Sequence, residues 1–205
     1  MTGAVLRRIR LPASDRSANH YPTMSTPQPP KPAKLVIGLI LKDEALLGPA
    51  AEALEQCFGM PDMVSPWLSF DFTDYYQREM GAPLRRRMLS FRALVGPETL
   101  PEVKLKTNRI EGRFRVDGQR RVNIDPGIVT FERFVLATGK NYTHRIYLGR
   151  GIFADLTLLF SGGAFQPLPW TYPDYAQAPL RGFLEEVRRR YRYNLRGREN
   201  PQAGC

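Results

Sequence analysis

Nine polar residues of both charge signs stand where strand and helix periodicity directs them beside a hydrophobic core. At such positions carboxylates act as general acids and bases or hold a divalent cation, while ammonium and guanidinium groups neutralise a bound anion. Surface packing alone does not require so many mixed charges. The sequence therefore predicts a pocket for a phosphorylated or other anionic small molecule, with Mg²⁺ as a candidate cofactor. The nine residues are Asp71, Arg92, Lys104, Asn108, Glu111, Asn123, Asp125, Arg145 and Asp155.

Four side chains are the candidate catalytic groups: Asp71, Glu111, Asp155 and His144. A Ser-His-Asp triad in the body of the chain would have to use His144, but no G-x-S-x-G motif accompanies it. Its place on an apolar face near a strand end is more typical of a hydrogen-bonded core histidine than of a general base. Six residues are the candidate ligand-binding groups: Arg92, Lys104, Asn108, Asn123, Asp125 and Arg145.

A helix predicted over 99–114 carries three of these residues on one line. Lys104, Asn108 and Glu111 are spaced i, i+4 and i+7, so they border the apolar stripe of the helix. An ammonium, an amide and a carboxylate that converge at a sheet surface can grip a phosphate or a metal-bound anion. The alternative is an ordinary boundary line of solvated side chains.

A β-hairpin is predicted to place Arg145 directly opposite Asp155, provided that the three residues 149–151 close it. A two-residue loop would instead divide the apolar residues between the two faces. As an alternative to a functional role, the two residues form a cross-strand ion pair worth at most about 1 kcal/mol. In the three-residue register the expected core face comprises His144, Ile146, Leu148, Ile152, Ala154, Leu156 and Leu158.

The sequence leaves the role of two further segments open. Asn123 and Asp125 precede Pro126-Gly127, where their side chains could shape a turn by bonding to their own backbone. The aromatic segment 170–175 contains Asp174 and could stack a base or a sugar. A packed Ω-loop in which Asp174 caps its own turn accounts for this segment better.

Apolar periodicity predicts an α+β fold: a mostly antiparallel sheet with a ferredoxin-like βαββαβ start, an added hairpin and a C-terminal helix. The two helices of the start should lie on one face. The first should bury Cys57, and a capping box of Thr99 and Glu102 should open the second. The segment 75–83 is expected to be a loop. The expected strands are 34–41, 69–73, 87–93, 131–138, 143–148 and 152–160, and the expected helices are 49–58, 99–114 and one that begins at Pro179.

The composition is that of a soluble globular protein, with 42% hydrophobic residues and a formal net charge of +10. Most of this charge lies near the ends. Residues 1–33 and 181–205 carry +4 each, which leaves +2 for the rest. The charge distribution therefore favours nucleic acid only weakly as a partner. No apolar run approaches the roughly 20 residues that cross a bilayer, so no membrane partner is expected.

We expect a single domain over 34–195, between a disordered N-terminal extension at 1–33 and a flexible tail at 196–205. The extension is rich in proline and lacks apolar periodicity. A misplaced start codon would explain it, because a chain that starts at Met24 lacks most of it. Two cysteines and two histidines cannot form a zinc site or a disulfide framework, and no haem motif occurs. This cysteine usage suits a reducing cytoplasm.

Five blocks of the sequence are distinctive: Phe70-Asp71-Phe72-Thr73-Asp74-Tyr75-Tyr76, Glu79-Met80-Gly81, Asn123-Ile124-Asp125-Pro126-Gly127, His144-Arg145-Ile146-Tyr147-Leu148 and Trp170-Thr171-Tyr172-Pro173-Asp174-Tyr175. With these blocks, the chain resembles the prokaryotic family catalogued as domain of unknown function 4416. The resemblance implies little about chemistry, because the activity of that family is not established. Some relatives carry the label "GTP-binding protein". However, the nearest dipeptide to a P-loop, Gly139-Lys140, lacks both its first glycine and the Ser or Thr that coordinates magnesium.

Two other classes of function stay open. The runner-up is a nucleic-acid-binding module that uses the arginine runs 85–87 and 188–190 together with exposed tyrosines. A third hypothesis is a non-catalytic adaptor, which needs an exposed apolar patch. The pocket hypothesis makes a geometric demand, namely that five residues converge in one concave site: Asp71, Lys104, Glu111, Arg145 and Asp155.

Overall fold

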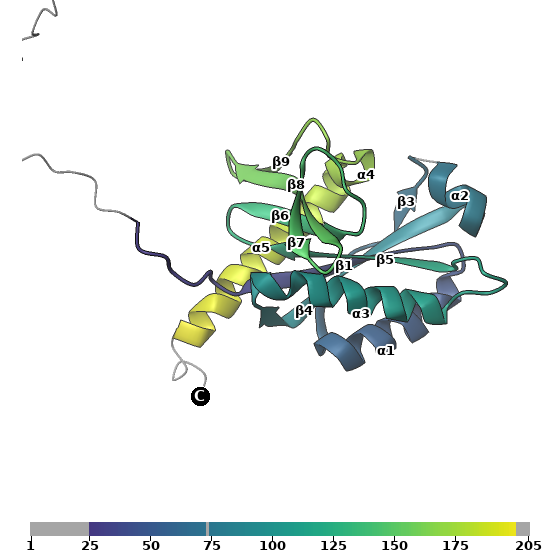
Figure 1. Ribbon diagram of the computed structural model, residues 1–205, viewed down its shortest axis with the longest axis horizontal. Coiled ribbons are helices and arrows are strands. Elements are labelled where there is room, and N and C mark those ends of the chain that lie inside the picture. The colour runs from purple at the N-terminus through teal and green to yellow at the C-terminus, as the bar shows by residue number, and fades with distance from the viewer. Residues whose placement is uncertain (1–24, 73, 200–205) are drawn as a thin grey trace, which may run out of the picture.

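The computed structural model describes residues 25–72 and 74–199, and nine strands within them form one sheet (Figure 1). The strands are β1 (Ala33–Leu41), β2 (Pro61–Val64), β3 (Leu68–Phe70), β4 (Leu84–Val95), β5 (Val122–Val129), β6 (Arg133–Thr138), β7 (Arg145–Gly149), β8 (Ile152–Ser161) and β9 (Ala164–Pro167). Their order is β2-β4-β1-β5-β6-β8-β7, with β3 paired to β4 and β9 paired to β8. All strand pairs are antiparallel, as the alternating segments predict.

Helices cover both faces of the sheet. They are α1 (Leu47–Phe58), α2 (Asp74–Met80), α3 (Leu100–Arg113), α4 (Pro173–Ala176) and α5 (Ala178–Glu199), with 3₁₀ turns at Glu44–Leu46 and Pro97–Thr99. α1 and α3 lie side by side on one face, and α5 crosses the other (Figure 1). Leu35 and Ile37 of β1 belong to the core under α1 and α3, whereas Val36 packs with Leu184 of α5. Because β1 is buried on both faces, its apolar residues do not alternate with polar ones.

The first half of the sheet is consistent with the expected βαββαβ start, since β1 lies between β4 and β5 and β2 lies outside β4. The predicted closing strand is displaced, however. The segment 131–138 forms β6, one place further out, and β5 takes the position beside β1. The structure also adds β2, which the sequence analysis did not predict, and places α2 where a loop was expected over 75–83.

The turn that the sequence left open around Pro126 does not form, because Asn123 to Gly127 are part of β5. Ile124 bonds to side chains of α3, so its backbone N–H and C=O point away from β1. Pro126, two residues further on, shares that orientation. β6 pairs with β5 only from Gly127 to Val129, so the missing N–H of proline costs no bond to either neighbouring strand.

Two expectations about the helices need correction. Cys57 is exposed, because Ala50 and Leu54 define the buried line of α1 and Phe58, four residues beyond Leu54, continues it. Thr99 makes no side-chain cap to α3. Its hydroxyl donates to the carbonyl of Gly96 at 2.8 Å instead, because the 3₁₀ turn places Thr99 in a helical rather than an extended conformation.

The outermost regular elements extend slightly beyond the expected boundaries at 34 and 195. β1 begins at Ala33, and α5 continues through Glu199, beyond the expected boundary at 195. Most of the segment 1–33, including the alternative start at Met24, lies outside the described residues, as do residues 200–205. Within 25–72 and 74–199, no helix combines the length and apolarity needed to cross a membrane.

Candidate functional site

A cavity of about 460 Å³ is lined by residues of both β5 and β6 beside the point where these strands separate. The two strands pair only over the last three residues of β5. β6 lines the cavity through Leu136, which ends this pairing opposite Gly127, and through Ala137 and Thr138, which lie beyond it. This volume lies within the range of small-molecule sites. Six aromatic side chains also line it, from β3 to α4: Phe70, Phe72, Tyr76, Tyr142, Tyr172 and Tyr175.

The same cavity holds charges of both signs. Its lining contains four of the residues singled out in the sequence, Lys104, Asp125, Arg145 and Asp155, from four different elements. The charged residues that sequence analysis had not proposed as site residues are Arg86, Lys140 and Asp174. With four cations and three carboxylates, the pocket carries a small positive excess.

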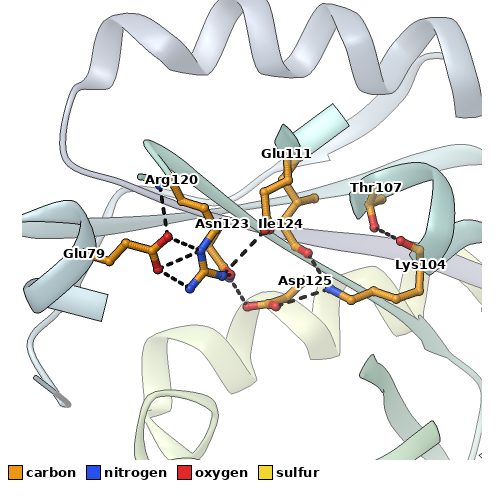
Figure 2. A network of polar contacts seen from close by, with 8 residues as sticks. All are labelled: Glu79, Lys104, Thr107, Glu111, Arg120, Asn123, Ile124 and Asp125. Atoms are coloured by element: carbon orange, nitrogen blue, oxygen red, sulfur yellow. Dashed lines mark hydrogen bonds and ion pairs between the residues drawn. The ribbon is translucent and has the colours of Figure 1, made fainter. Parts of the chain in front are cut away.

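At one end of the pocket, two side chains of α3 bond to the open edge of β5. The ammonium of Lys104 donates to the carbonyl of Ile124 at 2.9 Å and lies 3.9 Å from Asp125 Oδ1 (Figure 2). Glu111 Oε2 accepts from the Ile124 amide at 2.9 Å, and burial raises the pKa of Glu111. Two residues of the predicted line along α3, Lys104 and Glu111, therefore bond to this edge of β5, whereas Asn108 is exposed.

Arg120 links the pocket to α2 (Figure 2). Its Nη1 donates to Asn123 Oδ1 at 3.0 Å, and Asn123 Nδ2 donates to Asp125 Oδ2 at 2.8 Å. On the other side, Arg120 Nη2 donates to Glu79 Oε2 at 2.6 Å and its Nε donates to both Glu79 oxygens. These bonds lower the pKa of Glu79. Since Tyr76 of α2 lines the cavity, Arg120 helps to fix that wall.

The Arg86–Asp174 pair forms another wall of the cavity. Arg86 is only 3% exposed, and its Nη2 lies 2.9 Å from Asp174 Oδ2 and 3.8 Å from Asp125 Oδ2. The guanidinium lies over the rings of Phe70 and Tyr175, 5.1 and 4.6 Å from their centroids. Arg86 Nε has no hydrogen-bond partner in the described part of the chain. Burial raises the pKa of Asp174.

Sequence reasoning missed Arg86, Asp174 and Arg120 as site residues. Alternation along the run 85–87 was a usable signal, because Arg85 and Arg87 both lie over Trp67 while Arg86 enters the pocket. No comparable periodic signal marks Arg120, which lies in the connection between α3 and β5.

The hairpin pairs Arg145 with Asp155, as predicted. Arg145 Nε donates to Asp155 Oδ2 at 2.8 Å, and the two side chains are 3% and 4% exposed. The other two guanidinium nitrogens donate to the carbonyl of Lys140 at 2.9 Å and to the hydroxyl of Tyr172 at 3.3 Å. Arg145 is therefore fully engaged within the wall of the pocket.

The predicted core face of this hairpin is wrong for β7, although Ile152 and Leu158 of β8 are buried as expected. Ile146 is 70% exposed and Leu148 is exposed beside it, while the Arg145–Asp155 face is buried. The inner surface of β7 and β8 lines the polar cavity, so burial here does not follow hydrophobicity. The predicted three-residue loop is also wrong: Gly149 pairs with Ile152, and a register shift lies between Tyr147 and Gly149.

His144 lies behind the pocket wall. Its Nε2 is 3.3 Å from Asp155 Oδ2, and its ring stacks on Trp170 with the centroids 5.2 Å apart. It is half-buried and does not line the cavity. Within the aromatic segment 170–175, Tyr172 lines the cavity and Asp174 pairs with Arg86. That segment therefore contributes directly to the site.

Of the five residues that the pocket hypothesis expects to converge in one site, three line the cavity and a fourth lies next to it. Lys104, Arg145 and Asp155 line one cavity, and Glu111 supports it through Ile124. Asp71 does not line it. Two of the proposed ligand-binding residues, Arg92 and Asn108, are exposed and also lie outside the cavity.

The residues described here include no group of three or more His, Cys, Asp or Glu placed to hold a metal ion. Mg²⁺ is often held by one or two carboxylates together with phosphate oxygens of a substrate. In the pocket the carboxylate of Asp125 lies 3.8 Å from Arg86 and 3.9 Å from Lys104.

Comparisons with known proteins give one match. No curated protein and no solved structure matches the chain. A family model described as "Domain of unknown function (DUF4416)" matches residues 31–191, which include every lining residue of the pocket. The chain therefore belongs to the DUF4416 family.

Proposed function

We propose that this protein binds a small anionic molecule, such as a phosphate ester, in the pocket between β5 and β6. The observation that carries this proposal is the pair of cations beside Asp125. Lys104 uses its ammonium for one short bond, to Ile124, although it has three donor protons. Arg86 Nε has no bond to any described residue. Both cations therefore retain donor capacity for an anion.

The remaining lining indicates what the rest of the ligand is. Phe72 and Tyr172 of the lining expose part of their rings, which suits a sugar or a planar ring. Arg145 and Asp155 bond to each other and to neighbouring groups, so they shape the pocket and add little donor capacity of their own. The arrangement supports binding more directly than it supports a particular reaction.

If the ligand is also transformed, Asp125 is the residue placed for it. Its carboxylate lies 3.8 Å from Arg86 and 3.9 Å from Lys104, the two cations assigned to the anion. There it could accept a proton from the ligand or bind Mg²⁺ jointly with the ligand. Replacing Asp125 with Asn should then abolish turnover while binding persists.

A thermal-shift screen tests the proposal. The panel contains nucleotides, sugar phosphates and divalent ions, beside RNA and DNA oligomers at two salt concentrations. Stabilisation by a phosphorylated metabolite that is lost in Lys104→Met supports it, since ligands stabilise the state that binds them. Stabilisation by oligomers alone, with a steep loss at higher salt, would contradict it.

The RNA and DNA oligomers are included in the screen because of the surface of α5. The outward face of α5 carries exposed Arg189, Arg192 and Arg196, with Tyr193 70% exposed among them. Arginines interleaved with an exposed ring suit single-stranded nucleic acid. A nucleic-acid-binding role is therefore the second candidate, and it would leave the pocket unused.

An adaptor role is the third candidate, because the structure contains the apolar patch that it needs. The outermost strand β7 exposes Ile146 and Leu148, and Ile146 and Trp170 line one surface pocket. Analytical ultracentrifugation of the wild type and of Ile146→Asp tests this role. A partner or second copy bound there would be lost in the variant, while binding of the phosphorylated compound would not change.

A further inference from the structure

A second cavity, of about 310 Å³, shares its wall with the pocket. Phe72, Arg86 and Asp174 line both cavities. The second cavity is completed by residues next to and within β3, by Gln177 between α4 and α5, and by the first residues of α5. The two spaces are thus neighbours across one buried ion pair and one half-exposed ring.

The second cavity differs from the first in chemistry. Apart from the shared ion pair it contains no charged residue. Trp67, Leu68, Pro179 and Leu180 provide apolar lining, and Leu180 is buried in the core packed by α5. An apolar group can therefore leave water there without desolvating further charge.

Arg86 is placed between the two spaces in a fixed orientation. The rings of Phe70 and Tyr175 hold the plane of its guanidinium, and Asp174 binds one of its terminal nitrogens. A buried cation with an unused donor nitrogen can bind an anion without first losing another partner.

We propose that the second cavity is a subsite for the apolar part of the same ligand. The ligand would then be a monoester in which a phosphate or similar anion binds at Arg86 and Lys104 and a short alkyl or aryl group occupies the space lined by Trp67 and Leu180. This proposal rests on the proposed function of the first pocket. It adds that the bound molecule is amphipathic.

Titration calorimetry with ethyl, butyl and hexyl phosphate tests the subsite. If the chain enters the second cavity, affinity should rise about threefold to fourfold for each buried methylene group. In the variant Gln177→Trp a bulky ring partly fills that cavity, because Gln177 is exposed and lines only it. This variant should bind ethyl phosphate like the wild type but lose the gain from longer chains.

Gln166→Trp is the matched control. Gln166 is also exposed, its side chain makes one long hydrogen bond like that of Gln177, and it lines neither cavity. The control should retain the chain-length gain. Equal affinity for all three esters, or a gain that persists in Gln177→Trp, would overturn the subsite while the first pocket stands. Failure of every ester to bind the wild type would overturn the proposed function and the subsite with it.

Discussion

Lys104 of α3 donates a hydrogen bond to the main-chain carbonyl of Ile124 in β5, at the level of the sheet where β6 has no pairing with β5. An unpaired strand edge presents polar backbone groups that must find partners. Here the helix supplies them, because Glu111 accepts from the amide of the same residue. The strands can therefore separate, and the space beside them becomes a polar cavity rather than continuous sheet.

Breaking the Arg145–Asp155 pair should cost far more than breaking a surface ion pair, because both side chains are buried. Asp155→Ala leaves the guanidinium without its carboxylate and should lower the free energy of unfolding by about 3 to 5 kcal/mol. The double variant Arg145→Met, Asp155→Leu removes both charges and should lose much less. Urea unfolding of the single and double variants measures this. A loss of 1 kcal/mol or below in Asp155→Ala would show that water reaches the pair.

Replacing Gly127 should disturb the point where β5 and β6 begin to pair. A Cβ at this position would lie 2.7 Å from the carbonyl oxygen of Val135 and 2.9 Å from the ring of Phe134. Because a backbone atom cannot move aside easily, Gly127→Ala should cost about 1 to 3 kcal/mol. Gly112→Ala in α3 is the control, since nothing lies within 4 Å of a Cβ added there. This variant should melt at or above the wild-type temperature. Equal melting temperatures for the two variants would contradict the close approach.

The Glu79–Arg120 contact should make the free energy of unfolding depend on pH in the acidic range. Hydrogen bonds from Arg120 lower the pKa of Glu79 in the folded state. The unfolded chain therefore takes up the proton first, so the contribution of this contact is complete above the ordinary pKa of about 4.3 and disappears as the pH falls through the lowered one. Glu79→Gln should melt lower than the wild type at pH 7, by the few degrees that correspond to about 1 kcal/mol. The difference should shrink toward pH 3, and a constant difference between pH 7 and pH 3 would argue against the contact.

Local periodicity was enough to predict several parts of the site. The i, i+7 spacing of Lys104 and Glu111 places both on one side of α3, and both reach Ile124. The period of two along the hairpin predicts Arg145 opposite Asp155. These relationships depend on positions close in the chain, which is why the sequence contains them.

The orientation of the hairpin and the course of β5 could not be predicted in the same way. Ile146 was assigned to the core because apolar residues are normally buried, but the buried surface at this point is a cavity lined by charge. Pro126 indicated a turn because proline rarely occurs within a central strand. Only the separation of β6 from β5, a tertiary property, makes it acceptable there.

The remaining parts of the site depend on contacts between distant segments. Glu79 and Arg120 are 41 residues apart in the sequence, and Arg86 and Asp174 come from β4 and α4. No repeat or spacing connects such pairs. They arise where the ends of separate elements meet around the cavity.

The central claim is that Lys104 binds an anion in the pocket, and titration calorimetry with ethyl phosphate tests it most directly. Lys104→Met retains most of the side-chain length without the charge, and Lys106→Met, two residues along the same helix, removes a charge that is exposed and outside the pocket. The account predicts that Lys104→Met weakens binding at least tenfold and that Lys106→Met leaves it within twofold of the wild type. Equal weakening in the two variants, or no binding by the wild type, would contradict it.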